Sequence, residues 1–333
     1  MKWYSVFMIV FLCTACSNDG GTEKDPSDQF HVDILFSTSG LGDSGYNDAI
    51  LYGIQQASMK HGFKVNFHQP KTMEAGWECY QEWLNEPDDA VKKLFIFASN
   101  DYEKQLRANH PSTKENRDIL FFESDSPIEN VGSFRLNMYG ASYYIGKLAG
   151  SIVPTAATLM ANPYDTPITE SEEGFRAGFC SESEPDNYDV FCLTDDKHKG
   201  YNMPDSAYRI TYKIAQTHSF VWPLAGGSNI GVFQYTREYL PTLFTAGMDV
   251  DMSGLSFGIV CSLLKRMDLV LDDYLSRWMK GERITDHMVY GLDTDYIQIK
   301  ISDIYLEYFE GLSEWTTGLK EEAIEKEKQY ENK

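Results

Sequence analysis

The sequence of 333 residues predicts an α/β fold in two lobes, each with a mostly parallel sheet that carries helices on both faces. Two observations lead to this prediction. Short apolar runs alternate with segments of helical periodicity from His31 onward, and the same alternation begins again near Ala157. In addition, the stretch from Ile34 to Ala57 is typical of a buried strand, a loop of Ser, Thr, Gly and Asp, and a helix. Two successive α/β units in one chain indicate two similar lobes with a cleft between them.

The first unit contains five apolar runs that predict strands and four segments whose periodicity predicts helices. The expected strands are 32–36, 64–68, 94–99, 119–123 and 133–136, and the expected helices are 48–61, 77–84, the segment beginning at 102–107, and 139–152. The first of these helices should end near Gly62, because glycine readily adopts the left-handed conformation found after many helices.

The second unit repeats the pattern over the rest of the chain. Strands are expected at 157–161, 188–193, 220–224, 243–249, 287–292 and 296–300, and helices at 171–179, 204–216, 230–239 and 265–280. The tail from Leu319 onward is rich in Lys and Glu, which favours an exposed helix. The sequence has no short-period repeat and predicts no transmembrane helix beyond its N-terminal signal.

The first residues predict an export signal of the lipoprotein type. Lys2 precedes an almost wholly apolar run from Tyr4 to Leu12, and Cys13-Thr14-Ala15-Cys16 resembles a bacterial lipobox. We therefore expect a signal peptide at 1–15, lipidation of Cys16 and a flexible polar tether at 16–30. The mature chain would be a membrane-anchored lipoprotein on the periplasmic or cell-surface side. The alternative is an ordinary cleaved signal with an unmodified cysteine.

Composition and scattered polar residues exclude several classes of function. The formal net charge is -21 and no Lys or Arg cluster is present, which argues against binding of nucleic acid or an anionic membrane. The seven His residues show no metal-ligand spacing, and no catalytic hydrolase or zinc-protease motif occurs, so we expect no metal, no cofactor and no catalytic residues. An aromatic content of 14% suits either a ring-stacking site or an aromatic core.

Export would place the remaining cysteines in a compartment that permits disulfides. Cys79, Cys180, Cys192 and Cys261 stay in the mature chain, and Cys180 and Cys192 flank one polar loop. A Cys180–Cys192 bridge is one possibility, and four free thiols are another, because the sequence does not select among connectivities.

The loop between the first expected strand and helix is the first candidate for ligand binding. A helix N-terminus at the carboxyl end of a parallel strand offers free N–H groups and a partial positive charge. Tyr46 and Asn47 lie at the mouth of this loop, and they offer an aromatic face and a paired donor and acceptor. The spacing matches neither G-x-G-x-x-G nor a Walker A loop, so no nucleotide phosphate is indicated. A loop without any ligand is the alternative.

Three stretches in chain order resemble the basic membrane protein family of type I periplasmic binding proteins, which includes purine-nucleoside receptor lipoproteins. They are GLGDSGYNDAILYGIQQA (40–57), FVWPLAGGSNIGVFQYTRE (220–238) and GMDVDMSGLSFGIVCSLLKRMDLVLDDYL (247–275). The resemblance runs from about His31 to about Ile301. It implies two Rossmann-like lobes joined by three crossovers, ligand binding without catalysis, and partnership with an ABC permease and ATPase.

The resemblance also implies lobe boundaries. The crossovers would fall near Arg135, Ile259 and His287. The first lobe would then comprise 31–135 and 260–286, and the second lobe 136–259 and 287–318, followed by the charged tail 319–333.

The resemblance assigns roles to single residues. Tyr46 and Trp222 match two rings that stack on the base from opposite lobes, although Trp222 could instead be a core residue. Asn47 matches a residue that contacts the base, and Asp249 matches the carboxylate that accepts hydrogen bonds from ribose hydroxyls. Gly226 and Gly227 would allow the backbone to approach the ligand closely.

Further candidates complete the expected ligand-binding set, namely Ser37, Asp43, Asn100, Ser228 and Lys265. Lys265 is equally compatible with a solvent-facing helical position. Ser37 stands where nucleoside-binding members carry an Asp, and Asp251, a weaker candidate, is followed by Met252 where the family has Gln.

The resulting hypothesis is a substrate-binding lipoprotein for a nucleoside or a related compound of ring plus sugar. The alternatives are a binding protein for another solute such as a sugar, acting in transport or handing its closed form to a membrane receptor, and, less favoured, an exported nucleoside hydrolase.

Overall fold

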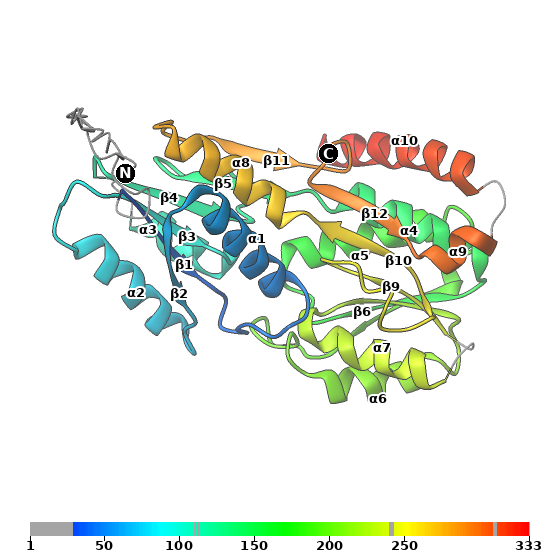
Figure 1. Cartoon of the computed structure of the whole chain (residues 1–333). Coiled ribbons are helices and arrows are strands. Elements are labelled where there is room, and N and C mark those ends of the chain that lie inside the picture. The colour runs from blue at the N-terminus through cyan, green and yellow to red at the C-terminus, as the bar shows by residue number, and fades with distance from the viewer. Residues whose placement is uncertain (1–28, 110, 112–113, 240–242, 309–311, 333) are drawn as a thin grey trace, which may run out of the picture.

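The computed structural model describes residues 29–109, 111, 114–239, 243–308 and 312–332 and arranges them in two α/β lobes (Figure 1). The expected signal, Cys16 and most of the tether lie outside these residues. The first sheet has the spatial order β11-β5-β4-β3-β1-β2, and its strands are β1 (Phe30–Leu35), β2 (Lys64–His68), β3 (Lys92–Phe97), β4 (Arg117–Phe122), β5 (Gly132–Leu136) and β11 (His287–Tyr290). All neighbouring pairs in this sheet are parallel.

The second sheet has the order β12-β10-β9-β8-β6-β7 and differs by one antiparallel edge. Its strands are β6 (Ala156–Met160), β7 (Tyr188–Cys192), β8 (Phe220–Leu224), β9 (Phe244–Gly247), β10 (Ile259–Lys265) and β12 (Ile297–Ile301). β12 runs antiparallel to β10, whereas the other pairs are parallel. These two mostly parallel sheets confirm the predicted fold class.

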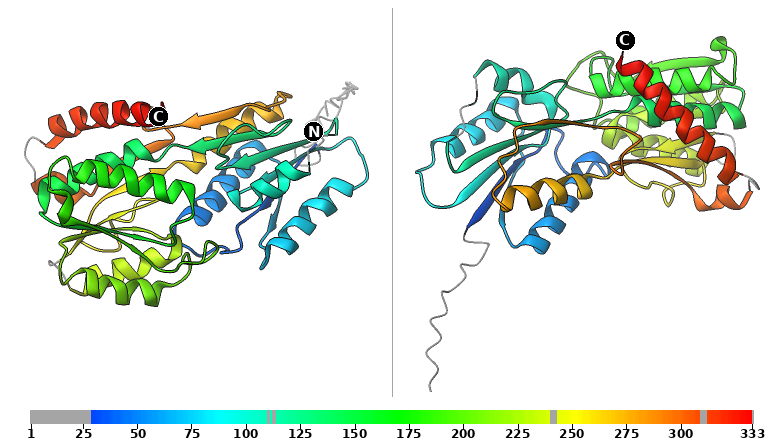
Figure 2. Two further views of the ribbon diagram at one scale, coloured as in Figure 1. Left: turned by 180° about the vertical axis from the view of Figure 1, so that it is seen from behind. Right: turned by 90° about the horizontal axis from the view of Figure 1, so that it is seen from above.

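Helices cover both faces of each sheet, which explains why strands such as β4 and β8 are buried along their whole length. The first lobe carries α1 (Tyr46–His61), α2 (Met73–Asn85), α3 (Glu103–Ala108) and α8 (Met267–Met279). The second carries α4 (Tyr139–Ile152), α5 (Thr166–Phe179), α6 (Pro204–Ile214), α7 (Asn229–Glu238), α9 (Asp303–Tyr308) and α10 (Leu312–Glu331). As expected, α1 ends at Gly62, whose φ is +77°. Figure 2 shows the two lobes from behind and from above.

Close packing of α4 on α5 depends on glycine. A Cβ atom on Gly146 of α4 would lie 2.0 Å from the carbonyl oxygen of Phe175, and one on Gly178 of α5 would lie 2.1 Å from that of Tyr143. Any larger residue would separate the helices. The small residues that the sequence shows along 139–152 therefore permit this helix contact.

The chain passes between the lobes three times, and the structure corrects two of the expected positions. The first passage lies between β5, which ends at Leu136, and α4, which begins at Tyr139. The second follows β10, because Ile259–Lys265 pairs with β9 and β12 in the second sheet, whereas 260–265 were assigned to the first lobe. The third follows β11, because His287–Tyr290 pairs with β5 in the first sheet, whereas 287–290 were assigned to the second lobe. The lobe to which β10 or β11 belongs depends on pairing with strands far away in the sequence, and sequence periodicity does not reveal such pairing.

Helix α10 is not the exposed tail helix that the charged composition predicted. Leu319, Ala323 and Glu327 recur at a spacing of four residues and are buried, because this face of α10 packs against α4 (Figure 2). The Glu327 carboxylate accepts hydrogen bonds from Gly140 N at 2.8 Å and from Leu292 N at 2.9 Å. Gly140 lies in the first turn of α4, directly after the first passage, and Leu292 lies in the third passage, so α10 is attached next to both.

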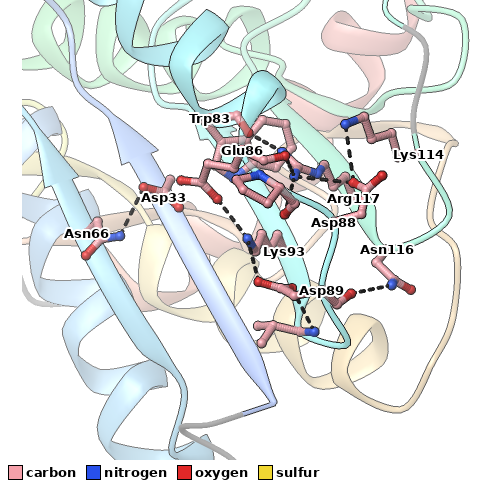
Figure 3. Close-up of polar contacts among 12 residues, drawn as sticks. Asp33, Asn66, Trp83, Glu86, Asp88, Asp89, Lys93, Lys114, Asn116 and Arg117 are labelled. Atoms are coloured by element: carbon pink, nitrogen blue, oxygen red, sulfur yellow. Dashed lines mark hydrogen bonds and ion pairs between the residues drawn. The ribbon is translucent and has the colours of Figure 1, made fainter.

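A polar cluster fixes the loop that enters β3, at the end of the first sheet where that strand begins (Figure 3). The buried Lys93 ammonium lies 2.8 Å from the Glu86 carboxylate and 3.1 Å from that of Asp89. The buried Arg117 guanidinium donates to the carbonyl oxygens of Trp83 and Glu86, the latter at 2.6 Å. Paired charges and satisfied carbonyl groups make this cluster a structural one.

Candidate ligand-binding site

A cavity of about 470 Å³ lies between the two lobes, within the range of about 300–1,000 Å³ that is typical of small-molecule sites. Its walls come from the segments that follow β1, β3, β4, β6, β7, β8, β9 and from the end of β10. These are carboxyl ends of strands in both sheets, where ligands of open α/β sheets bind. The predicted residues that line it are Ser37, Asp43, Tyr46, Asn47, Asn100, Gly226, Gly227, Asp249 and Lys265.

The lobes touch at the edge of this cavity. A Cβ atom on Gly45 of the first lobe would lie 3.1 Å from Asp249 Oδ2 in the second lobe. A Cβ atom on Gly227 of the second lobe would lie 3.4 Å from Asp43 Cα in the first. The two glycines thus allow backbone and side chain of opposite lobes to meet.

The loop after β1 is held by two carboxylates. Asp43 Oδ1 accepts from Gly45 N at 2.9 Å, and Asp43 Oδ2 accepts from the backbone and side-chain nitrogens of Asn47, each at 3.0 Å. Asp48 accepts from Gly42 N and Ser44 N, each at 2.8 Å. Burial raises the pKa of Asp43, an effect that these N–H donors oppose. Asp43 therefore orders the start of α1 and orients Asn47.

Two buried residues, Asp249 and Lys265, and the half-buried Tyr46 of the opposite lobe form the centre of the site. Lys265 Nζ lies 3.1 Å from Asp249 Oδ1 and 4.8 Å from the centre of the Tyr46 ring. The Lys265 backbone N–H donates to the Asp249 carbonyl oxygen at 2.9 Å, which ties the end of β10 to the end of β9. Burial opposes the charged form of Lys265, yet the carboxylates of Asp249 and Glu123 raise its pKa. The ammonium therefore stays charged in the cavity.

Asp249 has an unusual backbone conformation. Its φ of +73° lies in the left-handed region, which non-glycine residues adopt at an energetic cost. Such strain concentrates at binding sites, where it fixes the direction of a side chain. Here it accompanies a carboxylate that is only 5% exposed and lines the cavity.

Sequence reasoning missed several polar residues of the site, and three of them make hydrogen bonds in it. Glu123, at the carboxyl end of β4, accepts from the Tyr46 hydroxyl at 3.4 Å and from Leu136 N at 3.0 Å. Asp165, before α5, accepts from the Tyr201 hydroxyl at 2.5 Å. Burial raises the pKa of both carboxyl groups. An acid that ends an expected strand could have revealed Glu123, whereas Asp165 and Tyr201 lie in loops without a periodic signal.

The structure does not bring Trp222 or Ser228 to the cavity, which corrects two expected ligand contacts. Trp222 is fully buried in the core of the second lobe, with its ring centre 5.3 Å from that of Phe175. Its side chain lies on the side of β8 that α5 covers. Ser228 is also fully buried, and its hydroxyl accepts from Met203 N at 2.7 Å and donates to the Gly200 carbonyl at 2.5 Å.

Other candidates have structural partners outside the cavity. Asp251 forms an ion pair with Lys300 at 2.6 Å. Cys79, Cys180, Cys192 and Cys261 are free thiols, so Cys180 and Cys192 do not pair in this structure. In the part of the chain that the structure describes, no group of His, Cys, Asp and Glu is arranged to hold a metal ion.

Acceptors outnumber cations along the described cavity wall. The acidic residues there are Asp43, Asp101, Glu123, Asp165 and Asp249, and Lys265 is the one Lys or Arg. Two aromatic side chains, Tyr46 from the first lobe and Tyr201 from the second, add flat surfaces with polar tips. The arrangement suits a small ligand with a flat ring and several hydrogen-bond donors.

Comparisons with known proteins agree with this geometry. A family model described as "ABC transporter substrate-binding protein PnrA-like" matches residues 32–331. No curated protein is similar enough to this chain to count as a match.

Solved structures share the fold at low sequence identity. A solute-binding protein of an ABC transporter system from Aeropyrum pernix has 16% identity and a TM-score of 0.70, with 90% of this chain and 86% of that chain covered. A transcriptional activator of the comK gene from Bacillus halodurans has 18% identity and a TM-score of 0.68, with 86% and 95% covered. A sugar transporter structure from Clostridium phytofermentans has 14% identity and a TM-score of 0.60, with 83% and 100% covered.

Proposed function

Because the chain belongs to the family of PnrA-like ABC transporter substrate-binding proteins, we propose that its cavity captures a compound of flat ring plus sugar, with a nucleoside as the best candidate. Proteins of this family are not enzymes, and they bind small molecules outside the cytoplasm for an ABC transporter. The ligand class is our own inference from the site.

The arrangement of Tyr46, Lys265 and Asp249 carries this proposal. The Tyr46 ring lies in the cavity wall with the Lys265 ammonium 4.8 Å from its centre, and Asp249 lies 3.1 Å from the same ammonium. An aromatic face supports stacking of a heterocyclic ring. A buried carboxylate beside an ammonium group can accept two vicinal hydroxyls while the ammonium donates to one of them. Tyr46 would thus contact the ring of the ligand, and the neighbouring Asp249 and Lys265 would contact its sugar.

The second aromatic contact now falls to Tyr201 in place of Trp222. Tyr201 lines the cavity from the second lobe, and a Cβ atom on Gly226 would lie 3.3 Å from its ring. Tyr46 and Tyr201 therefore offer aromatic surfaces from opposite lobes. Asn47, whose side-chain nitrogen is held by Asp43, supplies a further polar contact for the ring.

Lipidation of Cys16 and delivery of the ligand to a membrane permease and its ATPase belong to the same proposal. The N-terminal signal and the polar tether support the anchor. Within the described ranges, no helix is long and apolar enough to cross a membrane.

Isothermal titration calorimetry against adenosine, inosine, cytidine, uridine and the free bases tests the ligand class. Tyr46→Ala should weaken binding of every ring compound by about 1–3 kcal/mol, the usual contribution of stacking on an aromatic side chain. Asp249→Asn should weaken the nucleosides by a similar amount and leave the free bases nearly unaffected. Ser37→Asp should shift selectivity toward purine nucleosides, if the acid found there in nucleoside-binding members reads the base.

Asp251→Asn provides the matched control, because this carboxylate forms an ion pair with Lys300 outside the cavity. Tight binding of a plain hexose with no binding of any nucleoside or base would refute the proposal. The two-lobed fold also serves sugar-binding proteins, so a sugar ligand is the named second outcome.

A further inference from the structure

Asp165 occupies a helix-capping position without capping the helix. It is the residue that precedes α5, with φ of −88° and ψ of 118°, and its side chain accepts no hydrogen bond from the first turn of that helix. An Asp at this position ordinarily accepts from a backbone N–H two or three residues later. Its carboxylate instead lines the cavity, where Tyr201 donates to Oδ2 at 2.5 Å. The Asp165 side chain therefore does not contribute the capping hydrogen bond that would stabilise α5.

The other carboxylate oxygen has no partner among the described residues. Asp165 Oδ1 is buried and makes no hydrogen bond with any described residue. A buried acceptor without a donor costs free energy that a suitable donor would recover. Because the side chain lines the cavity, a bound ligand is the group that can approach this oxygen.

The charges around Asp165 favour a ligand donor over a ligand acceptor. Glu123 lines the cavity from the opposite lobe, and Asp101 adds a further acid. Lys265 is the one described cation in the wall, and it is engaged by Asp249 at 3.1 Å. A carbonyl oxygen placed against Asp165 would therefore meet a negative surface with no free cation to offset the repulsion.

We infer that Asp165 is a specificity-determining residue that accepts a hydrogen bond from an amino group or protonated nitrogen of the ligand. The cavity should select compounds with an N–H donor at this point over counterparts that carry a carbonyl or hydroxyl group there. Tyr201 is the positioning residue, because its hydroxyl holds Oδ2 and directs Oδ1 to the ligand. This inference rests on the proposed function and narrows its ligand class to amino-bearing rings.

Matched ligand pairs test the inference in wild-type protein. The pairs are adenosine with inosine, cytidine with uridine, and glucosamine with glucose, measured by titration calorimetry. In the pair that the protein recognises, we expect the amino member to bind about tenfold to a hundredfold more tightly. This is the usual contribution of a hydrogen bond to a charged group, expressed as a ratio of affinities. The third pair keeps the test valid if the ligand is a sugar.

Two variants assign the preference to the proposed residues. Asp165→Asn preserves size but offers an amide donor, so the ratio of affinities should fall below about threefold or invert. Tyr201→Phe should reduce the ratio in part, because the carboxylate loses its orienting hydroxyl. Asp186→Asn is the matched control, since this exposed carboxylate of the same lobe lies outside the cavity wall, and it should leave the ratio unchanged.

The outcomes separate this inference from the proposed function. Equal affinity within every recognised pair, or an unchanged ratio in folded Asp165→Asn, would overturn the inference and leave a nucleoside-binding protein. Binding of glucosamine in preference to glucose with no nucleoside binding would overturn the proposed ligand class and retain Asp165 as the reading group. No binding to any member would overturn both. The wild-type comparison decides the matter even if a variant fails to fold.

Discussion

Replacement of Glu327 by Gln should remove a pH dependence of stability that wild-type protein shows between pH 4.5 and about pH 7. Burial raises the pKa of Glu327 from an ordinary value of 4.5 to about 7, and the carboxylates of Glu331 and Glu170 add to this rise. The N–H groups of Leu292 and Gly140 oppose it. Below pH 4.5 the carboxyl group is protonated in both folded and unfolded chains. Above that value the unfolded chain releases the proton first.

The magnitude follows from this rise in pKa. Each pKa unit corresponds to about 1.4 kcal/mol, so a rise of about 2.5 units is worth about 3 kcal/mol. The sign is that of a carboxyl group whose folded pKa is raised. Its contribution to the free energy of unfolding is fully present below pH 4.5, and it is lost as the pH rises through about 7. Wild-type stability relative to Glu327→Gln should therefore fall by about 3 kcal/mol across this window.

Urea unfolding at half-unit pH steps, followed by circular dichroism, measures the difference between the two proteins. Glu325→Gln is the matched control, because Glu325 lies on the same helix but is exposed, and its described partner is the side chain of Gln329. The control should keep the wild-type profile. Parallel pH profiles for wild type and Glu327→Gln would show that Glu327 does not hold its proton in the folded state, and the reasoning would be refuted.

Three further outcomes follow from the structure and the sequence. Trp222→Ala should lower the free energy of unfolding by about 3–5 kcal/mol, as for other buried aromatic side chains, without weakening ring ligands in calorimetry; a selective loss of binding would return Trp222 to the site. Gly291→Ala should lower the melting temperature, since its Cβ would lie 2.1 Å from Glu327 Oε1; an unchanged transition would contradict this. Cys16→Ser should release the protein from the membrane fraction, and continued acylated membrane association would disprove the anchor.

The alternation of strands and helices was predictable because parallel strands that are buried on both faces form apolar runs. The run that forms β10 was nevertheless missed as a strand, and the expected helix at 265–280 begins instead at Met267. Ile259–Lys265 pairs on one side with β9, the preceding strand, and on the other side with β12, which comes from a later part of the chain. Pairing of this kind depends on tertiary contacts, which local periodicity does not contain.

In the site, too, residues of one contiguous motif were predictable, whereas residues brought together from separate parts of the chain were not. Tyr46 and Asn47 were found because a strand, a loop and a helix follow each other directly in the sequence, and the structure places both in the cavity wall. The stacking role of Trp222 came from the family resemblance, and the sequence could not correct it, because a strand buried on both sides does not reveal which side meets the cavity. Asp165 and Tyr201 became visible only when two separate loops were brought together.

The strand order also determines how late each lobe can be completed during synthesis. β11 at 287–290 is the outer strand of the first sheet, yet it is made after β6 to β10 of the second. Until β11 is made, β5 presents an unpaired edge, and until the earlier segment α8 is made, α1 lacks its covering helix. An unpaired strand edge invites wrong pairing with other chains. A nascent chain cut off after β9 therefore contains neither finished lobe, because the first sheet still lacks β11 and the second still lacks β10 and β12.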